Sequence, residues 1–130
     1  MVYYLDTSAL LKFVVEEAES VDLLQWLQTG VESVSSDLSR TELLRAVRRA
    51  APDRLEDARA VLDGLILLTL TSATFEAAGR LNPDHLSSQD AIHLAAALSL
   101  GDDLDAVVTY DERFAQAARL QGVHVTAPGW

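Results

Sequence analysis

The segment Val2-Tyr3-Tyr4-Leu5-Asp6 is the most informative about the fold, because it joins a short apolar run directly to an acidic residue. The apolar part is β-branched, aromatic and aliphatic, and polar and apolar positions do not alternate in it. A strand of this kind is typically buried on both faces, as the strands of a parallel sheet are. After Asp6 the pattern changes, and residues 8–15 are predicted to form a helix. The chain therefore opens with a strand, an acid at its carboxyl end and a helix.

The same order repeats along the rest of the chain. Further strands are predicted at 32–35, 66–70, 106–109 and 123–126. Further helices are predicted at 17–28, 39–50, 52–62, 74–81, 87–100 and 111–120. Strands that alternate with helices imply right-handed crossovers and a parallel sheet covered by helices on both faces. We therefore expect a three-layer α/β/α sandwich with a five-stranded, mainly parallel sheet, and a single domain over residues 1–130.

The composition excludes several classes of protein. Of the 130 residues, 49% are hydrophobic and 23% are charged, which excludes a disordered chain. The sequence has no cysteine, so disulfide frameworks, thiolate zinc sites and cysteine nucleophiles are excluded. The opening residues do not form a signal-peptide pattern, and the longest apolar run is far too short for a membrane span. We therefore expect a cytoplasmic protein with no membrane partner.

The net charge is strongly negative, since 10 Lys and Arg stand against 20 Asp and Glu, which gives −10. A charge of this sign opposes non-specific adhesion to nucleic acids and to anionic membranes. Any action on RNA or DNA must therefore depend on a local basic patch or on bound cations.

Four acidic residues occupy similar places relative to the predicted elements. Asp6 and Asp111 each follow a strand, and Glu42 lies in the first turn of the helix that follows the second strand. Asp90 lies in the first turn of an alanine-rich helix, after a loop. Because ligands of open α/β sheets bind beyond the carboxyl ends of the strands, at least three of these acids are expected at one edge. Spacing alone does not place Asp90 there.

Helix capping is the simpler interpretation of each acid taken singly. The segments 39–42 (SRTE) and 87–90 (SSQD) match the capping box, in which an acid follows a serine cap by three residues. Asp6 and Asp111 fit simple N-caps.

The size of the repulsion between neighbouring carboxylates favours a functional role for the acids as a group. Two carboxylates ~5 Å apart repel by about 3 kcal/mol at an effective dielectric constant of ~20. Several such pairs would rival the whole stability of a domain, roughly 5–15 kcal/mol. An edge that collects three or four acids without a lysine therefore needs a cation, and oxygen ligands favour Mg²⁺ or Mn²⁺. Such an ion activates water and clamps phosphate oxygens during phosphodiester hydrolysis.

Four segments of the sequence resemble, in the same order, the motifs of the PIN-domain ribonucleases. The segments are 5–12 (LDTSALLK), 39–43 (SRTEL), 90–97 (DAIHLAAA) and 108–114 (VTYDERF). The likeness covers the whole chain, and its size and opening are similar to those of the VapC toxins of bacterial type II toxin–antitoxin pairs. Each segment alone is weakly specific, whereas four in order are a strong indication.

The resemblance implies an endoribonuclease that depends on Mg²⁺, for which Mn²⁺ substitutes. It assigns Asp6 and Asp90 as the principal metal ligands, and Glu42 and Asp111 as the acids that complete the pocket. Glu112 is adjacent and is the alternative to Asp111. The resemblance also implies that the hydroxyl groups of two residues orient water or the ligands; these are Thr7 and Thr109. It further implies a homodimer, an RNA substrate and a cognate antitoxin protein whose C-terminal segment covers the active site.

The basic residues are unevenly distributed, and six of the ten cations fall within residues 40–59. This group fits an electropositive rim that holds RNA phosphate. The candidate RNA contacts are Arg40, Arg45, Arg48 and Arg49. A solvated helix face, or an interface with the antitoxin or a second copy, fits the same pattern.

Several alternatives remain open on the sequence alone. His93 lies one helical turn from Asp90, and a half-buried packing role is a simpler interpretation than a ligand. A phospho-acceptor receiver would need a lysine in a late strand, but the one lysine is Lys12. A haloacid-dehalogenase-like phosphatase would need a second aspartate at position 8, which is Ser8. An inactive PIN scaffold that only binds partners is the remaining alternative.

Overall fold

The computed structural model describes residues 2–130, and strands and helices alternate along them as the sequence predicts. The strands are β1 (Val2–Leu5), β2 (Glu32–Ser36), β3 (Ile66–Leu68), β4 (Leu104–Val108) and β5 (Val125–Thr126). The helices are α1 (Thr7–Leu11), α2 (Ser20–Leu27), α3 (Leu38–Ala50), α4 (Leu55–Asp63), α5 (Ser72–Gly79), α6 (Ser88–Leu98) and α7 (Glu112–Leu120). Two short 3₁₀ helices complete the chain, η1 (Pro52–Arg54) and η2 (Gly101–Asp103). None of the helices within residues 2–130 is long and apolar enough to cross a membrane.

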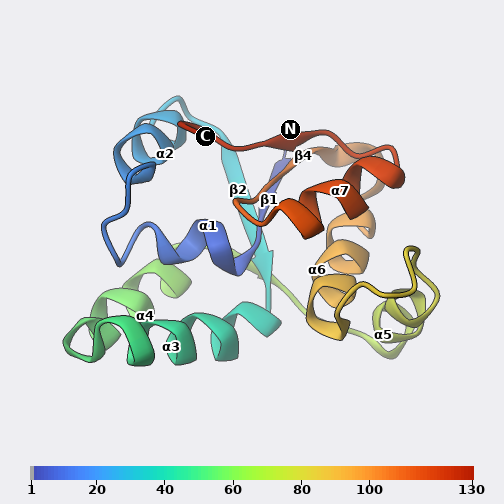
Figure 1. Cartoon of the computed structure of the whole chain (residues 1–130), viewed down its shortest axis with the longest axis horizontal. Coiled ribbons are helices and arrows are strands. Elements are labelled where there is room, and N and C mark those ends of the chain that lie inside the picture. Colours follow the sequence, from blue (N-terminus) through green and yellow to red (C-terminus); the bar gives the residue numbers. More distant parts are fainter. Residues whose placement is uncertain (1) are drawn as a thin grey trace.

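The five strands form one sheet in the order β3-β2-β1-β4-β5, and every pairing between neighbours is parallel. β1 therefore lies at the centre, where Tyr4 pairs with Val34 on one side and with Val107 on the other. Figure 1 shows α1 to α4 on one side of the sheet and α5, α6 and α7 on the other. The predicted three-layer α/β/α sandwich is confirmed, and its sheet is entirely parallel.

Consecutive residues of the central strands supply the two faces of the sheet. Leu5 and Val108 are buried in the core beneath α1 to α4, whereas Tyr4 and Val107 are buried in the core beneath α6 and α7. This alternation is the period of two that a strand imposes on its side chains. A strand that is apolar at every position is therefore what a sheet covered on both faces requires, which explains why the opening segment lacks alternation.

Some element boundaries differ from the predicted ones, because other hydrogen bonds satisfy the backbone groups that a longer element would use. The first helix was predicted at 8–15 but ends at Leu11, and the Ser20 hydroxyl donates to the Lys12 carbonyl oxygen at 2.8 Å. The last strand was predicted at 123–126 but begins at Val125, since the Val123 N–H donates to the Ala118 carbonyl oxygen at the end of α7.

The cap of α3 is a clearer correction. The 39–42 capping box is wrong, because α3 begins at Leu38 with Asp37 as its N-cap residue. Ser39 thus lies inside the first turn, fully buried against the sheet, with its hydroxyl 2.6 Å from that of Ser35. Glu42 is consequently free of a capping role.

Candidate active site

Asp6 stands at the carboxyl end of the central strand, and both of its carboxylate oxygens are held. Oδ1 accepts hydrogen bonds from the Ser8 hydroxyl at 2.6 Å and from the Ala9 N–H at 3.1 Å. Oδ2 accepts from the Thr109 hydroxyl at 2.5 Å. Only 4% of the residue is exposed, and burial raises the pKa of its carboxyl, against the lowering effect of the Ser8 and Thr109 hydrogen bonds. The predicted cap of α1 is confirmed, and the same carboxylate lies at the sheet edge.

Thr109 connects the ends of the two central strands. Its hydroxyl donates to Asp6 and accepts a hydrogen bond from the Asp111 N–H at 3.0 Å. Asp111 is the confirmed N-cap of α7, and its Oδ1 accepts from the N–H groups of Arg113 and Phe114. One buried hydroxyl therefore sets the position of Asp6 relative to the loop that carries Asp111.

Glu42 belongs to a second network, which is built around His93. The His93 Nε2–H donates to Glu42 Oε1 at 2.5 Å, and the Thr7 hydroxyl donates to the same oxygen at 2.8 Å. On the other side of the ring, Nδ1 lies 2.7 Å from the Tyr4 hydroxyl, and the proton of that hydroxyl is donated to Ser36. Half-burial alone would raise the pKa of the Glu42 carboxyl, but the hydrogen bond and charge of His93, together with Thr7, lower it overall.

His93 is more deeply buried than the half-buried packing residue that the sequence favours. Only 2% of it is exposed, and its ring packs edge-on against Tyr4 and Phe114. It serves packing and also holds Glu42. The signal in the sequence was its position one helical turn after Asp90.

Asp90 lies in the first turn of α6, whose N-cap Ser87 accepts a hydrogen bond from the Asp90 N–H at 3.1 Å. This serine cap was predicted. Partial burial raises the pKa of the Asp90 carboxyl, the nearby charge of Asp111 raises it further, and Asp6 contributes in the same direction. The fold therefore brings Asp90 close enough to both acids for their charges to act on it, which spacing along the chain did not settle.

The two candidates for the last acid of the site, Asp111 and Glu112, have different surroundings. Glu112 is exposed and pairs with Arg119, two turns further along the same face of α7, at 3.5 Å. Asp111 is the acid whose charge acts on Asp90.

The chemistry of the donors fits a hard divalent cation. Within residues 2–130, no lysine or arginine forms an ion pair with Asp6, Asp90 or Asp111. All the donors are oxygens, which Mg²⁺ and Mn²⁺ prefer. The same part of the chain has no group of three His, Asp or Glu side chains close enough together to hold an ion. Asp6, Asp90 and Asp111 are therefore neighbours whose charges interact rather than an assembled coordination shell, and Glu42 is hydrogen-bonded to His93 and Thr7.

Two further residues at the site carry no obvious signal in the sequence. The Ser8 hydroxyl, besides donating to Asp6, accepts a hydrogen bond from the Tyr110 N–H at 2.9 Å and so ties α1 to the end of β4. The Tyr4 hydroxyl reaches His93 from the middle of an apolar strand. Both bonds join positions 89 or more residues apart, so no local pattern predicts them.

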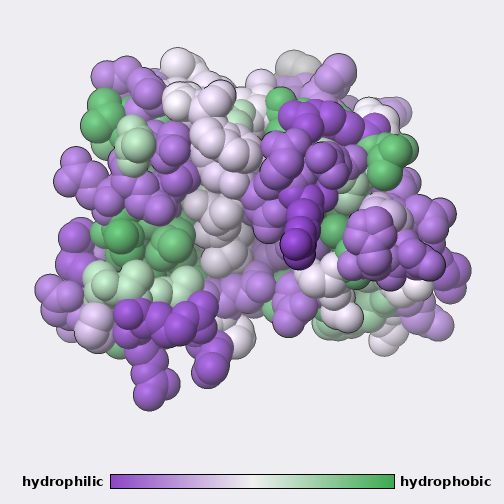
Figure 2. All heavy atoms as spheres, viewed as in Figure 1, coloured by the Kyte–Doolittle hydropathy of each residue, from purple (hydrophilic) through white to green (hydrophobic). Residues whose placement is uncertain are grey.

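The candidate RNA contacts on α3 lie at increasing axial distance from Glu42 along the helix. Arg40 is near the start of the helix and pairs with Asp37 at 3.0 Å. Arg45 and Arg48 line a groove between α3 and α4, beside Leu44 and Leu55. Arg49 is seven residues beyond Glu42, about 10 Å along the helix axis. Figure 2 shows hydrophobic residues gathered on the same face, between α2 and the α3–α4 pair.

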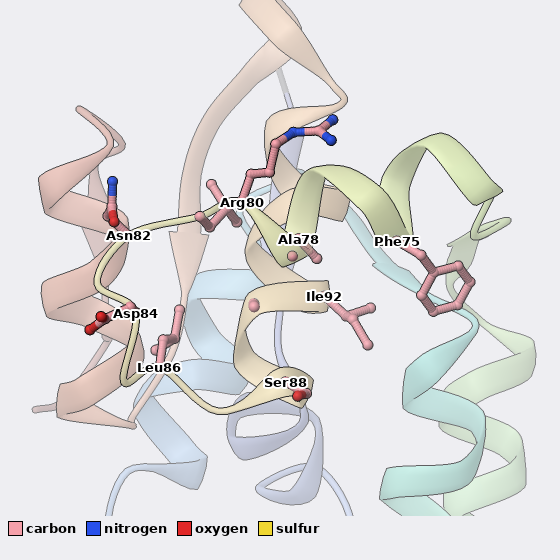
Figure 3. A pocket seen from close by; sticks show the side chains of 11 residues that line it. Phe75, Ala78, Arg80, Asn82, Asp84, Leu86, Ser88 and Ile92 are labelled. Atoms are coloured by element: carbon pink, nitrogen blue, oxygen red, sulfur yellow. The ribbon is translucent and has the colours of Figure 1, made fainter.

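Two cavities flank the segment that leads into α6. One, of about 400 Å³, lies between α5 and α6, and Figure 3 shows Phe75 and Ile92 at one end of it and Asn82 at the other. The second, of about 230 Å³, lies between this segment and α7, and Asp90 is part of its wall. The second cavity is therefore continuous with the acidic edge.

Comparison with known proteins agrees with this geometry. The PIN domain family matches residues 3–120. Ribonuclease VapC47 and Ribonuclease VapC46 of Mycobacterium tuberculosis are each 42% identical, over 97% and 96% of this chain and 96% of each relative. Ribonuclease VapC35 of the same organism is 38% identical over 97% of the chain and 96% of its own length.

Solved structures show the same fold at lower sequence identity. The M. tuberculosis toxin VapC20, described as cleaving the sarcin–ricin loop, superposes with a TM-score of 0.74 at 17% identity, over 88% of this chain and 94% of that one. VapBC2 of Rickettsia felis, solved bound to a DNA fragment from its promoter, superposes with a TM-score of 0.69 at 16% identity. The match covers 98% of this chain and 99% of that one. With the acids at the carboxyl edge and relatives that match over nearly their whole length, this chain belongs to the PIN-domain family and, within it, to the VapC group.

Proposed function

We propose that this protein is an endoribonuclease that hydrolyses RNA phosphodiester bonds with Mg²⁺ or Mn²⁺ and acts in the cytoplasm as the toxin of a toxin–antitoxin pair. One observation carries the proposal. Three carboxylates, those of Asp6, Asp90 and Asp111, lie at the carboxyl edge of the sheet without an ion-pair partner among residues 2–130. The names of the 42% identical relatives support the same activity.

Asp6 and Asp90 would hold the cation, and Asp111 would complete the site. When bound, a divalent ion activates a water molecule and offsets the charge of the phosphate. The chain fixes Asp6 through Ser8, Ala9 and Thr109, so this carboxylate is oriented before any ligand arrives. Preorganisation of this kind lowers the cost of ordering the site when it binds.

Glu42 has a separate part in the proposal. Its Oε1 accepts from His93 and Thr7, and no bond to Oε2 occurs among the described residues. The second oxygen therefore remains available to orient water or a metal-bound group. The Thr7 hydroxyl donates to Glu42 and the Thr109 hydroxyl donates to Asp6, which supports the resemblance's assignment of these two groups as orienting water or the ligands.

Binding of RNA and of protein partners is also part of the proposal. The α3 arginines, namely Arg40, Arg45, Arg48 and Arg49, supply positive charge beside the acidic edge, and phosphate contacts of this kind position a nucleic acid without reading its sequence. A cognate antitoxin and a second copy of the chain are the proposed protein partners. The structure of a VapBC complex, which has the same fold, supports the first of these.

The rival enzyme classes fit the structure poorly. A receiver would need a free lysine at the site, but Lys12 is 8% exposed and bonds to Glu17 and Glu19. A phosphatase of the haloacid-dehalogenase type would need an acid at position 8, whereas Ser8 supports Asp6.

The test is cleavage of a structured RNA by the purified chain with Mg²⁺, with Mn²⁺ and with a chelator. We expect cleavage with either ion and none with the chelator. Asp90→Asn should abolish cleavage and leave the fold intact, because the amide retains the shape of the carboxyl and Ser87 still caps α6. Gln89→Asn, at the adjacent exposed position, is the matched control and should retain activity. Full cleavage in chelator, or by Asp90→Asn, would refute the proposal.

A further inference from the structure

The cavity between α7 and the segment that precedes α6 has the features of a binding site. Its apolar walls come from Leu86, Ala117 and Leu120, and its polar rim from Arg113, Gln116 and Asp90. The volume of about 230 Å³ is smaller than the roughly 300–1,000 Å³ of a pocket for a drug-sized molecule. A flat ring system with a polar edge matches both this size and this lining.

The walls of this cavity are held in place by hydrogen bonds. Gln121, just after α7, donates from Nε2 to the Asn82 carbonyl oxygen at 3.3 Å. The Leu86 N–H donates to the Pro83 carbonyl oxygen at 3.1 Å, and Ser87 then caps α6. The cavity is thus formed by a segment anchored at both ends, one on α7 and one on α6.

The two arginines of α7 differ in a way that points to a ligand. Arg119 forms an ion pair with Glu112 at 3.5 Å. Arg113 lies on the rim of the cavity, and no ion pair engages its guanidinium among residues 2–130. It is therefore a free cation beside an acidic edge, in a protein of net charge −10. A guanidinium in this position suits a phosphate, which it binds through two parallel hydrogen bonds.

We infer that this cavity is a nucleotide subsite of the RNA-cleaving site, in which one nucleobase lies against Leu86 and Ala117 while Arg113 binds an adjacent phosphate. The Gln116 amide, with one acceptor and two donors, is placed to read the edge of that base. The inference rests on the proposed function, because Asp90 joins the cavity to the acids that would cleave the strand. It adds a determinant of base preference that the catalytic acids do not supply.

The larger cavity between α5 and α6 does not share these features. It opens on the face of α6 that carries Ser88 and Ile92, and none of the four candidate acids lines it (Figure 3). A base bound there would lie on the opposite face of α6 from Asp90.

The subsite is tested first by binding, which requires no cleavage. The four ribonucleoside 3′,5′-bisphosphates are titrated into the ¹⁵N-labelled protein at millimolar concentration. We expect them to bind with unequal affinity and to shift the Gln116 side-chain amide and the Ala117 N–H. Gln116→Leu should change the order of preference among the four, whereas Gln25→Leu, at an exposed position of α2, should not. Equal binding of all four, or no shift at these groups, would overturn the subsite.

The phosphate contact is tested with a 2′-O-methyl RNA oligonucleotide, which binds without being cleaved. Arg113→Gln should weaken binding by about tenfold and reduce the slope of log K against log salt by about 0.7, the value for one phosphate of a single strand. Arg119→Gln removes the same charge from the same helix and should change neither quantity. Equal effects of the two variants would refute the role of Arg113.

Failure of the nucleotide subsite and failure of the proposed function give different results. A wild-type protein that cleaves RNA but shows none of these binding effects retains the proposed function and loses the subsite. A protein that cleaves no RNA, yet binds one bisphosphate selectively at Gln116, loses the proposed function and retains a nucleotide site.

Discussion

Replacing Asp6 with Asn separates its two roles, since it removes one buried negative charge and nearly preserves the shape of the side chain. As a cap, Asn is about as good as Asp, and the amide oxygen can still accept from Ser8 and from the Ala9 N–H. The bond to Thr109 must reverse, because the new amide nitrogen donates where Oδ2 accepted. This reversal costs at most the ~0.5–1.5 kcal/mol of one hydrogen bond, because Thr109 must then direct its own proton elsewhere.

Removal of the negative charge has the opposite effect on stability and should raise the free energy of unfolding. Burial raises the pKa of the Asp6 carboxyl, so the folded state binds this proton more tightly than the unfolded chain does. Ionisation therefore lowers the free energy of unfolding as the pH rises above the usual carboxyl range. We expect metal-free Asp6→Asn to be at least as stable as the wild type at neutral pH.

The response to metal should differ sharply between the two proteins. At a free ion concentration ~100 times Kd, a bound cation stabilises the folded state by about 2.7 kcal/mol. For a domain of this size that is a rise in melting temperature of roughly 10 °C. Asp6→Asn should lose both this shift and RNA cleavage.

The assay is a thermal melt with Mn²⁺ and with a chelator, beside a cleavage assay on a structured RNA, for both proteins. Circular dichroism of the variant provides the control for folding. Full cleavage by Asp6→Asn with its Mn²⁺ shift preserved would refute the assignment of Asp6 as a ligand, and with it the mechanism.

Three other perturbations are informative. Replacing the α3 arginines Arg45, Arg48 and Arg49 with Ala should weaken RNA binding and flatten its salt dependence, while the metal-induced rise in melting temperature is preserved. An unchanged slope of binding against salt, with loss of dimer or antitoxin binding, would assign these arginines to a protein interface instead. Ser8→Ala should destabilise the fold by about 1–3 kcal/mol in a urea melt, because the Asp6 carboxylate loses a donor and the partly buried Tyr110 N–H loses its acceptor. An unchanged midpoint would contradict this. Lys12→Met should lower stability by about 1–3 kcal/mol yet preserve cleavage, since Lys12 pairs with Glu17 and Glu19 rather than with the acids of the site. Loss of cleavage in the folded variant would show that Lys12 also serves the site.

Features that depend on neighbouring residues could be predicted from the sequence alone. A strand apolar at every position requires a sheet covered on both sides, and Tyr4 and Leu5 indeed enter different cores. Acids directly after strands must lie at the carboxyl edge of a parallel sheet, which located Asp6 and Asp111. Local hydrogen bonds likewise made the caps at Asp6, Ser87 and Asp111 predictable.

Which of these groups interact across the chain could not be predicted in this way and followed from the folded arrangement of the elements. The bond between His93 and Glu42 spans 51 residues, and the bond between Thr109 and Asp6 spans 103. The proximity of Asp90 to Asp111, the burial of Ser39 and the contrast between Arg113 and Arg119 depend equally on packing between distant elements. The physical reason is that a local pattern records backbone hydrogen bonding and the periodicity of burial. The partner of a polar side chain depends on the orientation in which a remote helix packs against the sheet, and nothing in its neighbouring residues encodes that orientation.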